Sequence, residues 1–240
     1  MTTKAIVIPK EDLMPFLAGI KSPQTQTYAC LLYWLACRSG ELLPYTHYKL
    51  VYKRDEQGKL VKDDSGNYVV VSKSVSYDSP GVRVSDIHVG ENLIEFDNIP
   101  VFKSKERNKT KNGFVPRKNN PLFDNIALYI NNRKRLQDLE NQKALDSGSS
   151  PATVWLFEKE FPSDTNELFF WRFKKRLDRL LFKRGWSSHS LRKTRLTHAG
   201  NISGDPYFVQ ELSGHASINM ASEYVAKRKL FDSMRKYREL

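Results

Sequence analysis

Strand-like and helical segments occupy separate parts of this 240-residue chain, and that separation limits the folds it can adopt. Apolar residues recur at helical spacing before residue 40 and again after residue 122. Between these parts, residues 48–117 contain short β-branched and aromatic runs bounded by turn residues, which is typical of strands. Strands that are grouped together between helices favour the α+β class. We therefore expect an α+β fold.

The strand-like region begins with two runs, 49–52 and 68–71, on either side of a charged turn region rich in Asp, Gly and Ser. This arrangement predicts an inserted β-hairpin over residues 48–82. Adjacent acids beside Ser-Gly favour a solvated turn rather than a catalytic acid pair. The further strands that we expect are 82–89, 93–102 and 113–117.

The first long helix is expected to start at Ser22-Pro23, because serine is a common N-cap and proline is favoured at the first helical position. We expect it to end near residues 38–40, with Cys30 and Cys37 on one face as reduced core residues. Residues 1–21 are too short for a domain and read as a short strand or arm at 5–8, followed by a helical turn around 13–16. The later helices that we expect are 122–145, one through 169–181, and short pieces after 190 that break near 204–206 and 213–214.

The chain is strongly basic, with 39 Lys+Arg against 27 Asp+Glu, a formal charge of +12 and a pI of about 9.6. This excess favours a polyanionic partner, of which nucleic acid is the commonest. No Cys/His cluster has zinc spacing, no apolar run has membrane-spanning length, and no signal-peptide pattern is present. We therefore expect a cytoplasmic protein of a prokaryotic or virus-infected cell, without a membrane partner.

Basic side chains and a tyrosine gather in the last fifth of the chain. His189 and Arg192 lie one helical turn apart, and Gly214-His215 precedes Tyr224 by nine residues. A guanidinium can hold the charge that develops on a phosphodiester during attack, because its donors are planar and permanently charged. A phenol has a pKa of about 10 and needs a base or a cationic field to act as a nucleophile. The pattern therefore indicates attack of a tyrosine on a phosphodiester.

Three segments carry a family resemblance. Residues 189–198 read HSLRKTRLTH, which resembles the HxLRHTxATH box of the tyrosine recombinases, the phage integrase family. Residues 211–218 read ELSGHASI and are similar to that family's ELLGHSSI, with Tyr224 where its nucleophile falls. Residues 36–43 read ACRSGELL and resemble its first box, TGLRxSELL. The three boxes occur in the family's order, which makes the combined signal specific.

The resemblance implies a mainly helical catalytic domain with a small antiparallel sheet at one edge, and a role for each matched residue. Tyr224 would be the nucleophile, and Arg38 and Arg192 would clamp the scissile phosphate. His189 would assist proton transfer, and His215 would donate a hydrogen bond to the phosphate. No cofactor, metal or ATP is expected, because the 3′-phosphotyrosyl link conserves the phosphoester energy.

Two supporting residues complete the implied site. Glu41 would hold the basic cluster in place. The family also uses a lysine from a β-hairpin loop as general acid, and the basic loop 103–112 lies in the corresponding part of the chain. Lys109-Thr110 before Val115-Pro116 best matches the family's KT…VP pattern, so we expect Lys109 to be the acid, with Lys105 as the second choice. The other lysines of the loop are Lys103 and Lys111.

The implied function is site-specific DNA recombination or integration on double-stranded target sites, with self-association into a tetramer on DNA. We expect residues 1–21 to be a short arm without a separate core-binding domain, and residues 22–240 to be the catalytic domain. The amphipathic tail after Tyr224 would dock on a neighbouring protomer. Two alternatives stay open: a type IB topoisomerase, whose pattern lacks the Gly-His box, and a non-catalytic DNA-binding relative.

Overall fold

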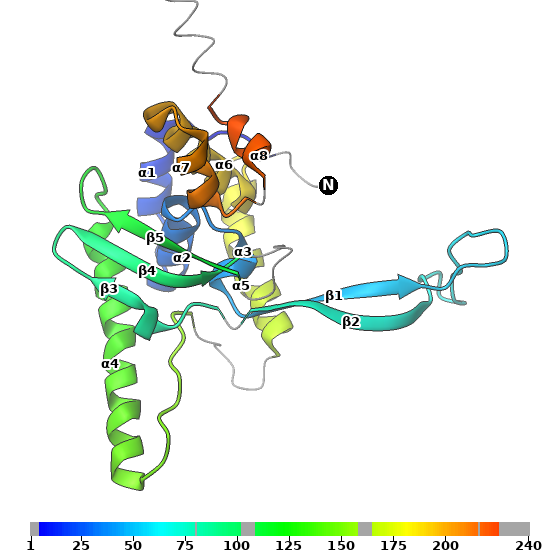
Figure 1. Cartoon of the computed structure of the whole chain (residues 1–240), viewed down its shortest axis with the longest axis horizontal. Helices are drawn as coiled ribbons and strands as arrows, with labels where there is room; N and C mark the ends of the chain where they lie inside the picture. The colour runs from blue at the N-terminus through cyan, green and yellow to red at the C-terminus, as the bar shows by residue number, and fades with distance from the viewer. Residues whose placement is uncertain (1–4, 80, 102–108, 158–164, 216, 226–240) are drawn as a thin grey trace, which may run out of the picture.

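A computed structural model describes residues 5–79, 81–101, 109–157, 165–215 and 217–225 of the chain. Helices pack around one central helix, a three-stranded sheet lies beside it, and a two-stranded hairpin projects away from the body (Figure 1). The α+β class predicted from the sequence is therefore confirmed, with the antiparallel strands grouped between helical parts of the chain.

Helix α2 (Pro23–Trp34) forms the centre of the fold. Its start was predicted correctly: the Ser22 side chain accepts a hydrogen bond from the Thr25 N–H at 3.4 Å, and Pro23 takes the first helical position. Every residue from Thr25 to Trp34 is buried, so the helix has no solvent face. It contacts the longer helices α1 (Lys10–Ala18), α4 (Phe123–Ser147), α5 (Asn166–Phe182) and α6 (Ser188–Ser203).

The end of α2 differs from the prediction. The helix stops at Trp34 and not near residues 38–40, because Ala36 adopts a left-handed φ of 47° and turns the chain away. A short helix, α3 (Ser39–Leu42), then starts after Arg38. Cys37 consequently lies outside the helix that contains Cys30, although both cysteines are free and buried as expected.

The three-stranded sheet has the order β3-β4-β5 and is antiparallel throughout. Its strands are β3 (Ile87–Val89), β4 (Leu93–Pro100) and β5 (Thr110–Pro116). The predicted strand at 82–89 was wrong over its first half, since Val84–Asp86 form a 3₁₀ turn (η1). Side chains on one face of the sheet, among them Ile94, Phe96 and Val115, belong to the main core.

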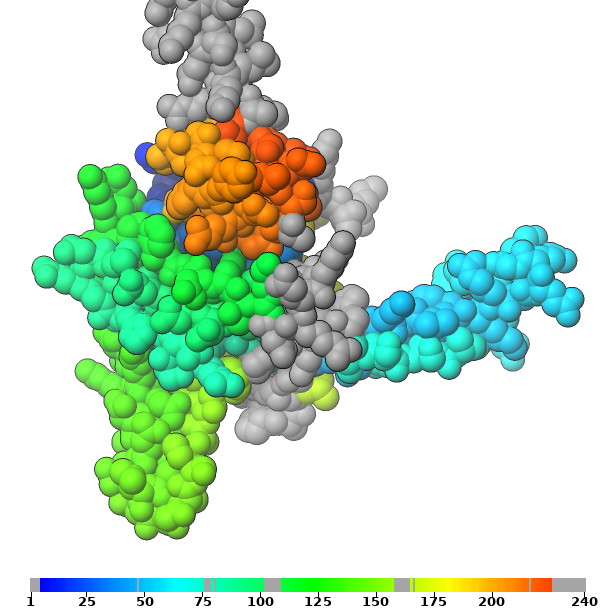
Figure 2. Space-filling view, in the orientation of Figure 1, coloured from blue at the N-terminus to red at the C-terminus, as the bar shows by residue number. Residues whose placement is uncertain are grey.

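The predicted hairpin is confirmed as β1 (Tyr45–Tyr52) paired antiparallel with β2 (Val70–Ser79). It projects well beyond the body of the molecule (Figure 2), and its described side chains from Lys49 to Val75 are almost all exposed. Among its described side chains, Tyr45 anchors the base, where its ring centroid lies 4.2 Å from that of Phe170 on α5. Whether the hairpin is an insertion stays a prediction.

The C-terminal part of the described chain consists of short helices, as predicted. Helix α7 (Pro206–Ser213) follows α6, and α8 (Ile218–Ser222) follows α7, with left-handed glycines at Gly204 and Gly214 ending the first two. A second, smaller core joins these helices to the end of α2; it consists of Ala36, Leu196, Ala199, Val209, Leu212, Ala221 and Val225. Within the described ranges, no helix combines the length and apolar character needed to cross a membrane.

Candidate active site

Segments that are far apart in the sequence meet where the two cores join. The α2–α3 turn, strand β5, helix α6 and the α7–α8 connection each contribute at least one side chain that the sequence singled out. The buried carboxylate of Glu41 lies among them, within 4 Å of the cationic groups of Arg38, Lys111 and Arg192.

Glu41 is fully buried and its two oxygens serve different partners. Oε1 accepts a hydrogen bond from Arg38 Nη1 at 3.1 Å, and Oε2 accepts one from the Arg38 backbone N–H at 2.9 Å. Oε2 also lies 3.7 Å from both Lys111 Nζ and Arg192 Nη1. A buried carboxylate is tolerated only when it is paired and hydrogen-bonded, and these contacts supply both conditions. Glu41 thus lies among the basic side chains that, from the sequence, we expect it to hold in place, and its supporting role stays a prediction.

Arg192 reaches into the cluster from α6 and is almost fully buried. Its Nη1 donates to the carbonyl of Ala36, and its Nη2 donates to the carbonyl of Ser213 at 2.9 Å. Burial lowers the pKa of the guanidinium, and the nearby Glu41 carboxylate opposes that shift. The left-handed turn at Ala36 presents its carbonyl to Arg192. This contact gives the early end of α2 a physical reason.

Lys111 makes a similar pair of contacts. At the end of each helix, it binds the carbonyl one residue before the carbonyl that Arg192 binds. Its Nζ donates to the carbonyl of Leu35 at 3.1 Å and to that of Leu212 at 3.0 Å. Lys111 and Arg192 therefore each join one carbonyl at the end of α2 to one at the end of α7. Carbonyls at a helix C-terminus carry partial negative charge, so they suit cationic partners.

The lysine predicted as general acid, Lys109, lies just before β5, and its carbonyl accepts a hydrogen bond from the Val101 N–H at 2.9 Å. The lysine whose Nζ lies 3.7 Å from Glu41 Oε2 is Lys111, which the sequence indicated only as one of the other lysines of the loop. The alternatives Lys103 and Lys105 lie outside the described residues. Strand alternation would put residues 109 and 111 on the same side, so periodicity alone did not distinguish them, and the choice of Lys109 rested on the KT…VP pattern.

His215 and Tyr224 lie together near Arg192. Their rings are nearly parallel, with centroids 6.2 Å apart. The His215 N–H donates to the Ser213 hydroxyl at 3.1 Å, which fixes the backbone after Gly214. Burial, and then the charges of Arg192, Arg38 and Lys111, lower the pKa of His215 to about 4, so its imidazole is neutral at pH 7.

Tyr224 is half-buried, and its surroundings act on its pKa in opposite directions. Burial raises the pKa of the phenol, whereas the charges of Arg192 and Arg38 lower it. A Cβ on Gly200 of α6 would lie 2.5 Å from the Tyr224 carbonyl oxygen, so only glycine allows this close approach. Gly200 was missed from the sequence, although a glycine inside a helix often marks such a contact.

His189 lies in the first turn of α6, one turn before Arg192, and its side chain is exposed. Its position on α6 agrees with the predicted spacing. Sequence reasoning missed the main-chain acceptors of the site, since the carbonyls of Leu35, Ala36 and Leu212 carry no signal in the residue types. Across the described ranges, no group of three or more His, Cys, Asp and Glu side chains is arranged to hold a metal ion.

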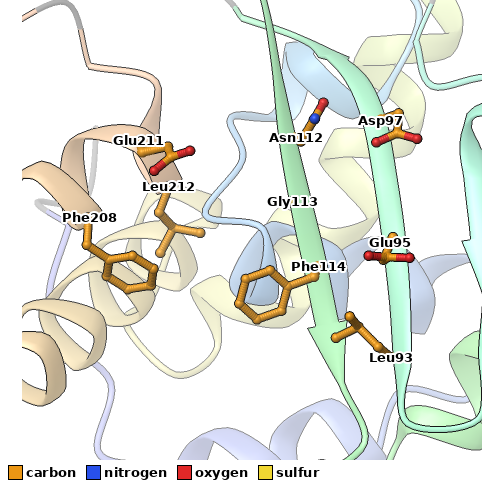
Figure 3. A pocket seen from close by; sticks show the side chains of 9 residues that line it. All are labelled: Leu93, Glu95, Asp97, Asn112, Gly113, Phe114, Phe208, Glu211 and Leu212. Carbon is orange, nitrogen blue, oxygen red and sulfur yellow. The ribbon is translucent and has the colours of Figure 1, made fainter.

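A separate groove of about 280 Å³ lies between the sheet and α7. Figure 3 shows Phe208 and Leu212 of α7 on one side and Phe114 of β5 on the other. Three carboxylates, Glu95, Asp97 and Glu211, also line it. The groove is thus apolar and acidic, and none of the predicted catalytic residues lines it.

A sequence model of the phage integrase family matches residues 81–230, which is more than half of the chain. The matched range includes Lys111, Arg192, His215 and Tyr224, and Arg38 lies before it. A comparison with curated proteins gave no match.

Solved structures of recombinases share the fold. The XerA recombinase has a TM-score of 0.54 at 16% identity, over 98% of this chain and 66% of that one. XerH bound to palindromic difH substrate, in a post-cleavage complex, has a TM-score of 0.53 at 14% identity, over 97% of this chain and 53% of that one. The Tn1549 transposon integrase with circular intermediate DNA has a TM-score of 0.52 at 17% identity, over 99% of this chain and 67% of that one. The chain therefore spans about half to two thirds of the length of these structures.

Proposed function

The chain belongs to the phage integrase family, and from this premise we propose that it cuts and rejoins double-stranded DNA at specific sites through Tyr224. The observation that carries the proposal is the convergence of Arg38 and Arg192 on Glu41, with the His215–Tyr224 pair beside them. A permanently charged, preorganised pair of guanidinium groups suits a phosphodiester whose charge increases in the transition state.

In the proposed step, Tyr224 Oη forms a bond to phosphorus while the bond to the 5′ oxygen breaks. The phenol proton passes to His189, and the 5′ oxygen takes a proton from a lysine. The phosphate stays linked to the tyrosine as a 3′-phosphotyrosyl ester, which a 5′-hydroxyl from either duplex can reverse. His215 would donate a hydrogen bond to a non-bridging oxygen, a role that suits a neutral imidazole.

We assign the general acid to Lys109 and a supporting role to Lys111. An acid must reach the leaving oxygen, whereas Lys111 Nζ is buried and donates to two main-chain carbonyls. Lys111 thereby holds the ends of α2 and α7 together behind the phosphate site. The domain assignment, with residues 1–21 as an arm and 22–240 as the catalytic domain, is part of the same proposal.

The test is covalent capture of DNA. A randomised duplex library nicked near its centre is incubated with protein, and DNA that survives denaturing washes is sequenced. We expect wild type to retain DNA with a common sequence, and Tyr224→Phe to retain none. Tyr207→Phe is the matched control, because Tyr207 is an exposed tyrosine on α7 outside the cluster. Failure of wild type to retain any DNA covalently would favour a non-catalytic DNA-binding protein.

The captured site then separates recombination from relaxation. A plasmid with two copies of the site should give recombinant circles, whereas relaxation of a one-site plasmid without recombinants would favour topoisomerase-like activity. Recombination joins two duplexes and needs four active sites, so we propose assembly into a tetramer on DNA. Gel filtration with light scattering on the captured duplex measures that assembly directly.

The groove between the sheet and α7 is a candidate surface for this assembly. Its apolar residues and its carboxylates Glu95, Asp97 and Glu211 complement a basic amphipathic segment. The tail 227–240, which lies outside the described residues, has that composition in its sequence. We propose that the tail of one protomer occupies the groove of another. Deletion of 227–240 or Glu211→Lys should lower assembly on DNA while leaving cleavage intact; unchanged assembly in both would contradict this contact.

A further inference from the structure

The segment before α1 lies along α6, the helix that carries His189 and Arg192. We call residues 5–9 the N-terminal strap. The Ile8 N–H donates to Thr194 Oγ1 at 2.8 Å, and the Ile6 N–H donates to Ser190 Oγ at 3.3 Å. These bonds join residues more than 180 positions apart in the chain.

The two bonds fit each other geometrically. Two residues of extended chain span about 6.6 Å, and four residues of α-helix rise about 6 Å, so alternate strap N–H groups meet hydroxyls one helical turn apart. Ile8, Ser190 and Thr194 are fully buried. Thr194 Oγ1 also donates to the Ser190 carbonyl at 2.7 Å, so its hydroxyl is engaged as both donor and acceptor.

The strap is also held at its first described residue. Lys193 Nζ donates to the carbonyl of Ala5 at 3.1 Å. In the family pattern quoted above, a histidine stands at the position of Lys193. The longer lysine side chain reaches the strap, which gives this departure from the pattern a structural purpose in this chain.

The strap bonds lie on either side of Arg192 along the helix. On its other face, the Arg192 guanidinium is anchored to the carbonyls of Ala36 and Ser213. Ser190 Oγ also accepts the N–H of Ser187 at 3.1 Å in the helix cap, next to His189. The first two turns of α6 are thus bound on one side by the strap and on the other by the arginine contacts.

We propose that the N-terminal strap is a positioning element for the active site, with Thr194 as its main contact. The strap fixes the depth and rotation of the start of α6, and so sets where Arg192 and His189 meet the phosphate. It touches no reacting atom. The inference rests on the proposed function, because its effect is on DNA cleavage by Tyr224.

The test compares Thr194→Val with Thr194→Ser on the full chain. Valine keeps the shape of threonine but leaves the buried Ile8 N–H without its acceptor, whereas serine retains the hydroxyl. The readout is the single-turnover rate of covalent complex formation at saturating captured-site DNA, at a temperature where circular dichroism shows each variant folded. Because small misplacements of catalytic groups are costly, we expect a roughly 10- to 100-fold lower rate for valine.

Serine should restore most of that rate, and DNA affinity should stay the same in both variants. Ser203→Ala is the matched control, because it removes a hydroxyl from the same helix at the end remote from the strap. Lys193→Met loosens the strap without creating a buried unpaired N–H, and a smaller rate loss in the same direction is expected.

The outcomes separate this inference from the proposed function. If wild type forms no covalent complex, the proposed function fails. If wild type cleaves and Thr194→Val cleaves at the same rate while its melting temperature falls, the strap is only a stabilising contact and the inference is overturned. A loss confined to DNA affinity would overturn it equally.

Discussion

Removal of the charge on Glu41 tests whether the cluster is held together by this one carboxylate. Glu41→Gln keeps the size of the side chain but leaves the cations of Arg38, Lys111 and Arg192 within a few ångströms of one another. The side chains of Glu41, Lys111 and Arg192 are 0%, 6% and 6% exposed, so solvent screens them little. Breaking a buried ion pair typically costs about 3–5 kcal/mol.

We therefore expect the free energy of unfolding of Glu41→Gln to fall by about 3–5 kcal/mol, measured by urea denaturation followed by circular dichroism. For a chain of this size, the corresponding drop in melting temperature is about 6–20 °C. The control is Glu140→Gln, which breaks another i,i+3 pair, 2.7 Å from Lys143, whose side chain is 72% exposed. That surface pair should change stability by no more than about 0.5 kcal/mol.

Phosphate-bearing ligands provide a second readout. An anion that occupies the site replaces part of the missing negative charge, so cognate DNA should raise the melting temperature of Glu41→Gln more than that of wild type. A loss of stability below about 1 kcal/mol, with equal stabilisation of both proteins by DNA, would refute the reasoning.

Three further outcomes are expected. A DNA substrate with sulfur in place of the bridging 5′ oxygen has a leaving group that needs no general acid. This substrate should restore cleavage by Lys109→Met but not by Lys111→Met. The reverse pattern would exchange the roles of the two lysines. The pKa of His215 is lowered from 6.5 to about 4, so the unfolded state binds more protons than the folded state between these pH values. The free energy of unfolding should therefore rise with pH in this range and fall as pH is lowered. Urea titrations from pH 4 to 7 should show a flatter slope for His215→Asn. Replacement of residues 53–69 by a two-residue turn should leave the melting temperature nearly unchanged, because no side chain of this segment is buried, and a large decrease would show that it supports the core.

Local sequence signals predicted the elements of the fold well. The cap at Ser22, the hairpin and the glycine breaks at 204 and 214 each depend on neighbouring residues, so they could be predicted from the sequence. The end of α2 could not, because Ala36 is a good helix former. Its left-handed turn depends on Arg192, which lies 156 residues away.

The sequence indicated which residues gather at the candidate site, but it did not indicate which atoms they contact. Charge and spacing indicated Arg192, His215 and Tyr224, and the structure brings these residues together. The sequence could not show that Lys111 is the lysine that contacts Glu41 and the two helix ends, since other lysines lie close to it in the loop. What distinguishes it is the pair of carbonyls that it meets, at Leu35 and Leu212, and main-chain acceptors leave no trace in composition.

These carbonyls explain how a site made from distant segments keeps one geometry. Lys111 joins the carbonyls of residues 35 and 212, and Arg192 joins those of 36 and 213, so the two cations form consecutive links between the ends of α2 and α7. A rotation of α7 would strain both links together. The separation of the two helix ends therefore bears on the position of Arg192. If Arg192 holds the phosphate as proposed, a change in the packing of α7 should affect phosphate binding even where no residue of the proposed site is altered.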